Sequence, residues 1–145
     1  MDLLKPPGLL ADIASFAADN AARHQPMYNV AAAIATLSSL SANKFRVRPT
    51  NNALNVYMLI EGESGGGKSS PRDTVVVLHR EAHFEEALLS APASAPALLK
   101  NLADKEDGLM TPTRCVTIDE FGKHLKHARN PASHQSEVIT ELVRL

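Results

Sequence analysis

The chain has little of what marks a secreted or membrane protein. Cys115 is its only cysteine, so an internal disulfide is impossible and a reducing compartment is expected. No apolar run reaches the roughly 20 residues that a membrane-spanning helix needs. Residues 1–7 lack the charged and apolar regions of a signal peptide. We therefore expect a cytoplasmic protein with no membrane partner.

The chain also lacks a charge excess and any internal repeat of useful period. Lys and Arg total 15 against 16 Asp and Glu, which gives a net charge of −1. The overall charge therefore indicates neither a nucleic acid nor a membrane as partner. The 145 residues suffice for a domain with a buried core. Information on function must come from local motifs.

The most informative segment is a glycine-rich loop near the middle of the chain. Its sequence is Gly62-Glu63-Ser64-Gly65-Gly66-Gly67-Lys68-Ser69. It fits G-x-x-x-x-G-K-[ST], the phosphate-binding loop (Walker A motif) of nucleoside triphosphatases. Glycines let the backbone adopt positive φ and approach an anion closely. We expect this loop and Ser70 to bind the nucleotide, with Lys68 reaching the β- and γ-phosphates as a catalytic group and Ser69 ligating Mg²⁺.

The segments around the loop favour this interpretation over a chance glycine-rich turn. Residues 54–60 form an apolar run that predicts a buried strand leading into the loop. A helix is predicted from about Lys68 to Leu88, with Pro71 in its first turn, where a missing N–H is tolerated. A strand, a glycine loop and a helix in this order direct backbone N–H groups toward a phosphate.

A second motif lies about fifty residues further on, a spacing that suits the same site. Residues 114–120 form a short apolar run that ends in Asp119 and Glu120, the pattern of a Walker B strand. Asp119 would hold Mg²⁺, directly or through water, and Glu120 would polarise the attacking water as general base. Alone, this pattern is typical of any strand that enters a solvated loop. The Asp-Glu pair favours an ATPase over a small-molecule kinase, whose Arg-rich lid is not evident.

Two helices and a strand are predicted before the loop. The helices cover residues 9–23 and 27–42, and the small residues of the second allow close packing. Their buried stripes are predicted to be Leu9, Ile13, Phe16 and Ala17 in the first, and Val30, Ile34, Leu37 and Leu40 in the second. The strand covers residues 44–48. Its cations Lys44, Arg46 and Arg48 predict a solvated edge, with a phosphate or single-strand contact as the alternative.

The remainder of the chain is predicted to be mainly helical. His79 and His83 are interpreted as solvated histidines of the helix after the loop, rather than as metal ligands. Ser94 is predicted to cap a helix that runs to Lys105. A last helix is predicted from about His134 to the end. Between Glu120 and that helix, a short basic helix is expected to carry Lys123, Lys126 and Arg129.

The order of these features resembles the primase-helicase-associated ATPases of phages, plasmids and integrated elements, many of them classed only as a domain of unknown function. The resemblance covers nearly the whole chain. It rests on the Ala-rich helical pair, the R-V-R strand, an N-x-Y strand before G-E-S-G-G-G-K-S-S-P, the S-A-P-A-L-L-K-N-L stretch and the I-D-E-F-G segment. The Pro after Lys-Ser and the Phe-Gly after Asp-Glu are more specific than the Walker patterns alone.

The resemblance implies an α/β fold with a RecA-like P-loop NTPase core of the Asp-Glu type. This core would occupy residues 44–145, after a helical segment over residues 1–43. Gly67, Lys68 and Ser69 would bind ATP and Mg²⁺, and Asp119 and Glu120 would serve hydrolysis. The implied role is DNA unwinding or replication of a mobile element, with single-stranded or forked DNA as partner and a homo-oligomer as the complete assembly.

One departure from this class stands out. A further strand, which follows Walker B in sequence, normally lies between the phosphate-loop strand and the Walker B strand. This chain stops at Leu145, before such a strand. We therefore expect an incomplete core whose hydrolysis gains from downstream strands. A nucleotide-binding regulatory module without turnover and a small-molecule phosphotransferase remain as alternatives.

Overall fold

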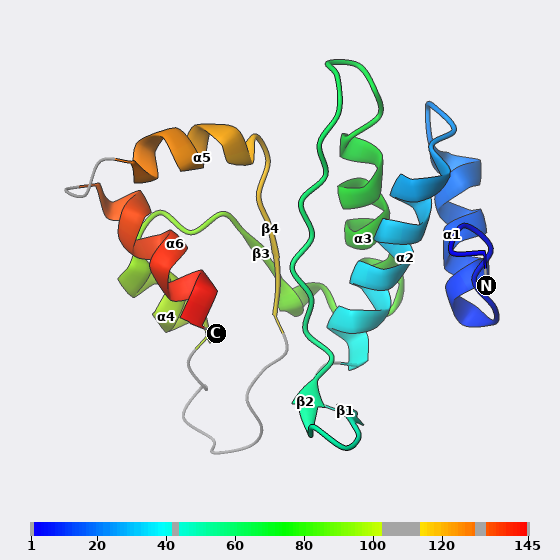
Figure 1. Cartoon of the computed structure of the whole chain (residues 1–145), viewed down its shortest axis with the longest axis horizontal. Helices are drawn as coiled ribbons and strands as arrows, with labels where there is room; N and C mark the ends of the chain where they lie inside the picture. The colour runs from blue at the N-terminus through cyan, green and yellow to red at the C-terminus, as the bar shows by residue number, and fades with distance from the viewer. Residues whose placement is uncertain (1, 42–43, 103–113, 130–132, 145) are drawn as a thin grey trace. The chain divides into compact units, whose positions relative to one another are not determined.

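The computed structural model describes residues 2–41, 44–102, 114–129 and 133–144 (Figure 1). Its contacts divide the chain into two compact units, Met1–Glu85 and Glu86–Leu145. The fold is mixed α/β and mostly helical, which confirms the α/β prediction at this level. The assignment of residues 1–43 to a helical segment and of residues 44–145 to an ATPase core remains a prediction.

The first unit begins with a packed pair of helices, as predicted. Helix α1 is Leu9–Asn20 and helix α2 is Pro26–Ser41. The first helix ends earlier than predicted because Ala21 is extended. Within α1, Ile13 and Ala17 are buried, whereas Leu9 and Phe16 are exposed. The predicted stripe was therefore too wide.

The buried face of α2 differs from the predicted one. The predicted apolar residues Val30, Ile34, Leu37 and Leu40 are only half-buried. Small and polar side chains take their place, namely Asn29, Ala32, Ala33, Thr36 and Ser39. Helix α2 lies between α1 and α3 and packs against both (Figure 1). Small side chains let the three helices approach closely, so these residues of α2 are buried against its two neighbours.

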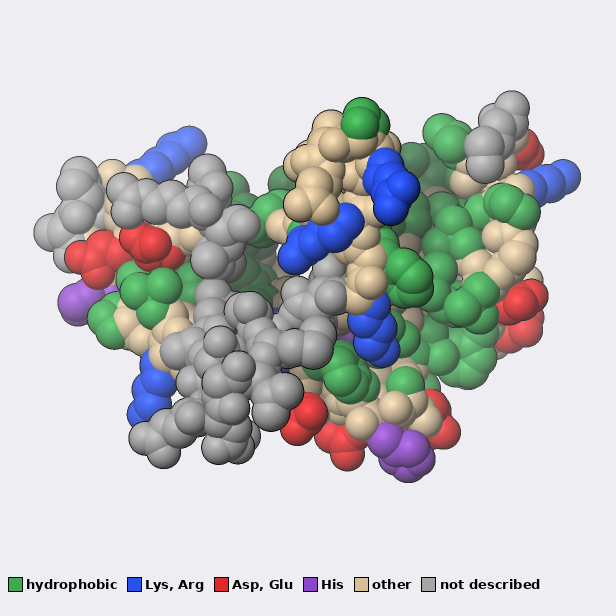
Figure 2. Space-filling view, turned by 90° about the horizontal axis from the view of Figure 1, so that it is seen from below, with side chains coloured by type: hydrophobic (Ala, Val, Ile, Leu, Met, Phe, Trp, Pro, Cys, Tyr) green, Lys and Arg blue, Asp and Glu red, His purple; other side chains and the backbone are tan. Residues whose placement is uncertain are grey.

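A short hairpin follows α2. Strand β1, Arg46–Val47, pairs antiparallel with strand β2, Asn52–Ala53, with Arg46 opposite Ala53. The backbone of Asn51 turns the chain with a φ of 58°, and its N–H donates to the Val47 carbonyl at 2.7 Å. The predicted strand over residues 44–48 is thus present but shorter. Its cations are exposed, as predicted, and Figure 2 shows basic side chains gathered on this hairpin.

The prediction of a buried strand over residues 54–60 is wrong. The segment is extended and has no strand partner among the described residues. Tyr57 and Leu59 are 67% and 71% exposed, while Val56 and Met58 are less so. Val56 and Met58 are themselves 44% and 40% exposed, so neither face of the segment is buried. An apolar run predicts extended backbone, but burial also requires neighbours on both faces.

Two hydrogen bonds hold this segment against α2. The Ser38 hydroxyl donates to the Leu54 carbonyl, and the Tyr28 hydroxyl donates to the Glu61 carbonyl at 2.8 Å. The two bonds lie at opposite ends of the segment. They fix its position along the helix, and therefore the position of the glycine loop that follows.

Helix α3, Ser69–Glu81, starts where predicted but ends seven residues before Leu88. His83 adopts a φ of 53°, and its N–H donates to the Arg80 carbonyl at 2.9 Å. The Phe84 N–H donates to the His79 carbonyl at 2.8 Å. These two bonds form a Schellman motif, which ends a helix and is usually built with glycine. The sequence signal was absent because His83 occupies the glycine position.

The prediction that His79 is solvated is wrong, whereas His83 is exposed as predicted. His79 is fully buried between α3 and α2. Its Nδ1 donates to the Val75 carbonyl at 2.7 Å, and its Nε2 lies 2.7 Å from the Ser39 hydroxyl. Both ring nitrogens are thus satisfied, which makes burial of the imidazole acceptable.

The second unit contains a short parallel strand pair and three helices. Strand β3, Leu88–Ser90, follows a single turn of 3-10 helix, Glu85–Ala87, and pairs with strand β4, Cys115–Thr117. The helices are α4, Ala95–Leu102, α5, Phe121–Ala128, and α6, His134–Arg144. The last packs against the other two.

The predicted N-cap of α4 is confirmed. The Ser94 hydroxyl accepts a hydrogen bond from the Ala97 N–H at 3.3 Å. The predicted extension of this helix to Lys105 lies outside the described residues. Among the described residues of this unit, Leu98 and Val138 are buried, together with Ala87, Pro92 and Ala95. Within the described parts of the chain, no helix has the length and apolar character to cross a membrane.

Candidate nucleotide-binding site

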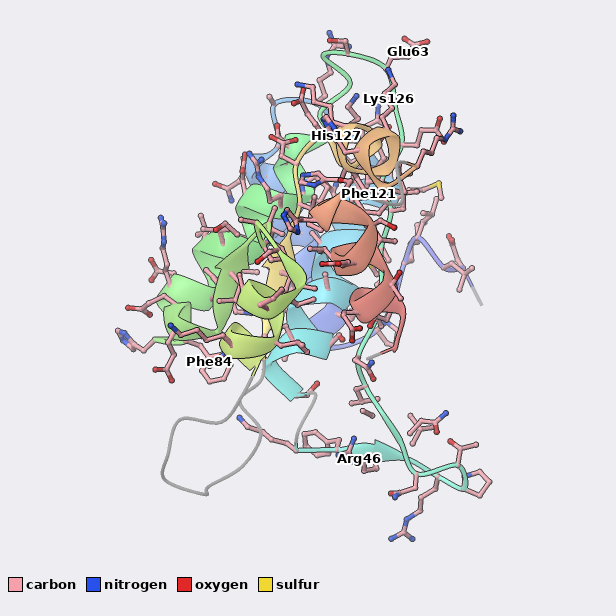
Figure 3. The ribbon with its side chains drawn as sticks, turned by 90° about the vertical axis from the view of Figure 1, so that its left-hand side faces the viewer. Arg46, Glu63, Phe84, Phe121, Lys126 and His127 are labelled. Carbon is pink, nitrogen blue, oxygen red and sulfur yellow. The ribbon has the colours of Figure 1, made fainter. Side chains whose placement is uncertain are left out.

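The glycine loop is held in a compact turn between the extended segment and α3. Gly65 and Gly67 have φ values of 74° and 86°, a region that favours glycine. The Gly66 N–H donates to the Glu63 carbonyl at 3.1 Å. Figure 3 shows Glu63 at the outer tip of this loop. The backbone at positive φ that the motif predicts is thus present at two of its four glycines.

Lys68 closes the loop. Its Nζ donates to the Gly62 carbonyl at 2.7 Å, and its side chain is exposed. A Cβ on Gly62 would lie 2.3 Å from the Tyr28 hydroxyl, so a larger residue there would have to displace the end of the Tyr28 side chain. A bond from an ammonium group to a neutral carbonyl is weaker than one to a phosphate oxygen. An arriving phosphate can thus take the ammonium group from the carbonyl.

The start of α3 adds backbone donors. Ser69 is the first helical residue, the cap position Lys68 provides no side-chain hydrogen bond, and the first turn has no acidic residue. N–H groups at such an end lack helical partners and carry a partial positive charge, which favours an anion. The Ser69 hydroxyl is exposed and has no hydrogen-bond partner within the described ranges. It is available to a cation.

A hollow of about 270 Å³ lies beside the loop, inside the first unit. Helix α1 contributes Phe16 and Asn20, and α3 contributes Thr74 and Val77. The loop side is formed by Gly67 and Ser69. The hollow is therefore a space between two helices that meets the glycine loop.

Sequence reasoning missed several residues at this site. A Cβ on Gly67 would lie 3.5 Å from the Cβ of Arg23, in the connection between α1 and α2. Tyr28 approaches Gly62, as described above, and Phe16 and Asn20 line the hollow. All four precede the loop by more than thirty residues in the sequence. No local signal could have linked them to the loop.

The Walker B segment belongs to the second unit. Its strand, Cys115–Thr117, is shorter than the predicted range, and Asp119 and Glu120 follow it at the exposed end. Glu120 has a φ of 50°, and its N–H donates to Asp119 Oδ1 at 2.9 Å. Its carboxylate forms an ion pair with Lys123. The predicted strand that leads into the two carboxylates is present, but its partner β3 was not predicted. The roles of Asp119 and Glu120 remain predictions.

The two predicted magnesium ligands, Ser69 and Asp119, lie in different units. The described portion of the chain contains no group of three or more His, Cys, Asp or Glu that could hold a metal ion. Mg²⁺ usually keeps several waters and binds one or two protein groups together with the substrate phosphates. A site of that kind needs no preformed cluster.

No protein-family model, curated protein or solved structure matches the chain. The resemblance to the primase-helicase-associated ATPases and the P-loop core both remain predictions.

Proposed function

We propose that this chain binds ATP with Mg²⁺ through residues 62–70 and belongs to a P-loop ATPase. Lys68 is the catalytic cation, Glu120 is the general base, and Ser69 and Asp119 ligate the metal. The observation that carries the proposal is the loop itself. Two glycines at positive φ precede Lys68, whose ammonium lies over the loop, and a helix N-terminus follows directly.

The roles of Asp119 and Glu120 rest on their sequence pattern, with support from their position after a parallel strand. Ligands of parallel sheets bind beyond the carboxyl ends of the strands. Both side chains are exposed there. Removal of a proton from water by a positioned carboxylate is the step that Glu120 would perform.

We further propose that hydrolysis is coupled to DNA replication or unwinding. The hairpin supports a DNA contact. Lys44, Arg46 and Arg48 are exposed, have no ion pair within the described residues, and lie in a stretch without acidic residues from 44 to 60. Figure 3 shows Arg46 on the hairpin, which extends away from the helices. Exposed cations of this kind bind phosphate backbones.

The test is Mg²⁺-dependent ATP binding by titration calorimetry, comparing the wild type with Lys68→Ala. The substitution removes a charged hydrogen-bond donor, so ATP affinity should fall by at least about tenfold. Lys5→Ala is the matched control, because it removes the same charge from an exposed position outside the loop. It should bind ATP like the wild type.

The outcomes separate the alternatives. Binding that depends on Lys68 and is followed by phosphate release supports an ATPase. Such binding without phosphate release identifies a regulatory nucleotide-binding module. Equal binding by the wild type and Lys68→Ala, or no binding by either, would show that the loop is not a phosphate site.

A further inference from the structure

The hollow between α1 and α3 has no role in the Walker motifs. We propose that it holds the nucleoside part of the bound nucleotide, with adenosine as the best fit. This inference rests on the proposed nucleotide binding by the loop. It assigns base recognition to the N-terminal helix, which the motifs leave without a function.

The position of the hollow suits a nucleoside. Gly67, Ser69 and Ser70 line it and also belong to the phosphate-binding loop. Backbone N–H groups of such a loop cradle the α- and β-phosphates, and the lysine reaches the β- and γ-phosphates. The α-phosphate carries the nucleoside, and the hollow starts where the loop passes into α3. A nucleoside attached there has the hollow directly beside it.

The walls of the hollow offer an apolar surface for a base. Phe16 remains 36% exposed on α1, although its neighbour Ala17 is buried. Val77 lies across from it on α3 and is 40% exposed. Aromatic side chains bind bases of any sequence by stacking on their faces. An exposed ring beside an anion site is therefore a suitable platform.

The polar groups of the hollow favour a ligand that donates hydrogen bonds. The Asn20 amide nitrogen donates to the Phe16 carbonyl at 2.8 Å, which leaves the side-chain oxygen of Asn20 as an acceptor. Asp73 has acceptor capacity beyond its exposed ion pair with Arg72. Adenosine carries an amino group on the base and two hydroxyls on the ribose. The side-chain oxygen of Asn20 can accept from the amino group of the base, and the Asp73 carboxylate can accept from the ribose hydroxyls.

Thr74 provides an independent sign of a ligand. It is only 5% exposed, lines the hollow, and makes no side-chain hydrogen bond with any described residue. No fully buried side-chain nitrogen or oxygen lacks a partner in the part of the chain that the structure describes. The Thr74 hydroxyl therefore keeps some access to its surroundings. A ligand in the hollow can supply its partner.

The size of the hollow agrees with a nucleoside rather than with a whole nucleotide. Its volume of about 270 Å³ lies near the lower end of the roughly 300–1,000 Å³ of small-molecule sites. The triphosphate would lie outside it, along the loop. The site thus consists of two parts, a loop for phosphates and a hollow for the nucleoside.

The experiment compares ATP with inorganic tripolyphosphate by titration calorimetry in Mg²⁺. The wild type should bind ATP more tightly, because only ATP fills the hollow. Phe16→Leu should lower ATP affinity about tenfold through loss of stacking and leave tripolyphosphate affinity unchanged. Phe45→Leu is the matched control on the exposed hairpin and should change neither.

A second variant tests the same site in case Phe16→Leu fails to fold. Asn20→Leu should lower ATP affinity and reduce the preference for ATP over ITP, which has a carbonyl in place of the amino group. Retained tripolyphosphate binding shows in each variant that the loop is intact. Wild-type ATP binding no tighter than tripolyphosphate binding, or ATP binding unaffected in Phe16→Leu, would overturn the nucleoside site but leave the phosphate loop standing. No binding of either ligand by the wild type would overturn both.

Discussion

At the scale of single residues, the pair formed by Ser39 and His79 shapes the first unit. The Val75 carbonyl can only accept, so His79 Nδ1 carries a hydrogen, and in the neutral ring Nε2 then accepts from the Ser39 hydroxyl. Both side chains are buried. The pair joins α2 to the helix that follows the phosphate loop, so it helps to set the position of that helix.

Ser39→Ala tests this role. The substitution leaves a buried acceptor on His79 without a partner, so the free energy of unfolding should fall by about 1–3 kcal/mol. Chemical denaturation followed by circular dichroism measures the change. Ser41→Ala is the control, because its hydroxyl bonds only to the Leu37 carbonyl of its own helix. It should cost less than about 0.5 kcal/mol.

A double substitution shows whether the loss comes from the unsatisfied nitrogen. In a His79→Leu background, no acceptor remains, so Ser39→Ala should cost far less than in the wild type. Equal costs in the two backgrounds would contradict the proposed pairing. So would equal effects of Ser39→Ala and Ser41→Ala in the wild type.

At the scale of elements, the hairpin differs from the rest of the first unit. It carries three exposed cations and the exposed side chain of Phe45. On α5, by contrast, Lys123 is already paired with Glu120. The hairpin is therefore the better candidate for a contact with single-stranded DNA.

Replacing Lys44, Arg46 and Arg48 together by Ala should weaken single-strand binding. Each lost phosphate contact lowers the slope of log affinity against log salt by about 0.7, so three lower it by about 2. Fluorescence anisotropy with a labelled oligonucleotide over a salt series measures this slope. The matched variant replaces Lys123, Lys126 and Arg129 and changes the net charge equally. A larger loss in that variant would assign the contact to α5.

The elements also show what local sequence can and cannot predict. The start of α3 and the Ser94 cap were predictable because a glycine loop and a capping hydroxyl act within a few residues. The end of α3 was not, because His83 occupies a position where glycine is the usual signal. The burial of His79 could not be predicted from its position in the helix. A polar side chain is expected to face water unless a buried partner such as Ser39 is known.

At the scale of the whole molecule, contacts between segments distant in the sequence decide which residues are buried and where a hollow forms. Residues 54–60 are apolar enough for a buried strand, yet no described strand pairs with them. The hollow between α1 and α3 depends on how these helices pack against each other, which neither helix specifies alone. The Walker motifs predicted candidate residues within each unit. They could not predict that Phe16, Asn20 and Arg23 lie near the glycine loop.

The proposed hydrolysis assigns roles to Lys68 and Glu120, which belong to different units. Glu120→Gln keeps the size of the side chain but removes the base. The rate of phosphate release should fall by about 10²–10⁴, while ATP affinity stays within about twofold, since binding rests on the loop. A phosphate-release assay and titration calorimetry measure the two quantities.

Glu86→Gln is the matched control, because it makes the same change at an exposed residue of the second unit. It should hydrolyse ATP like the wild type. Unchanged turnover in Glu120→Gln would remove Glu120 from the mechanism. If the wild type binds ATP through Lys68 but releases no phosphate, Glu120 does not act as a general base in this chain. Nucleotide binding without turnover is then the activity of this chain, as expected of a regulatory module.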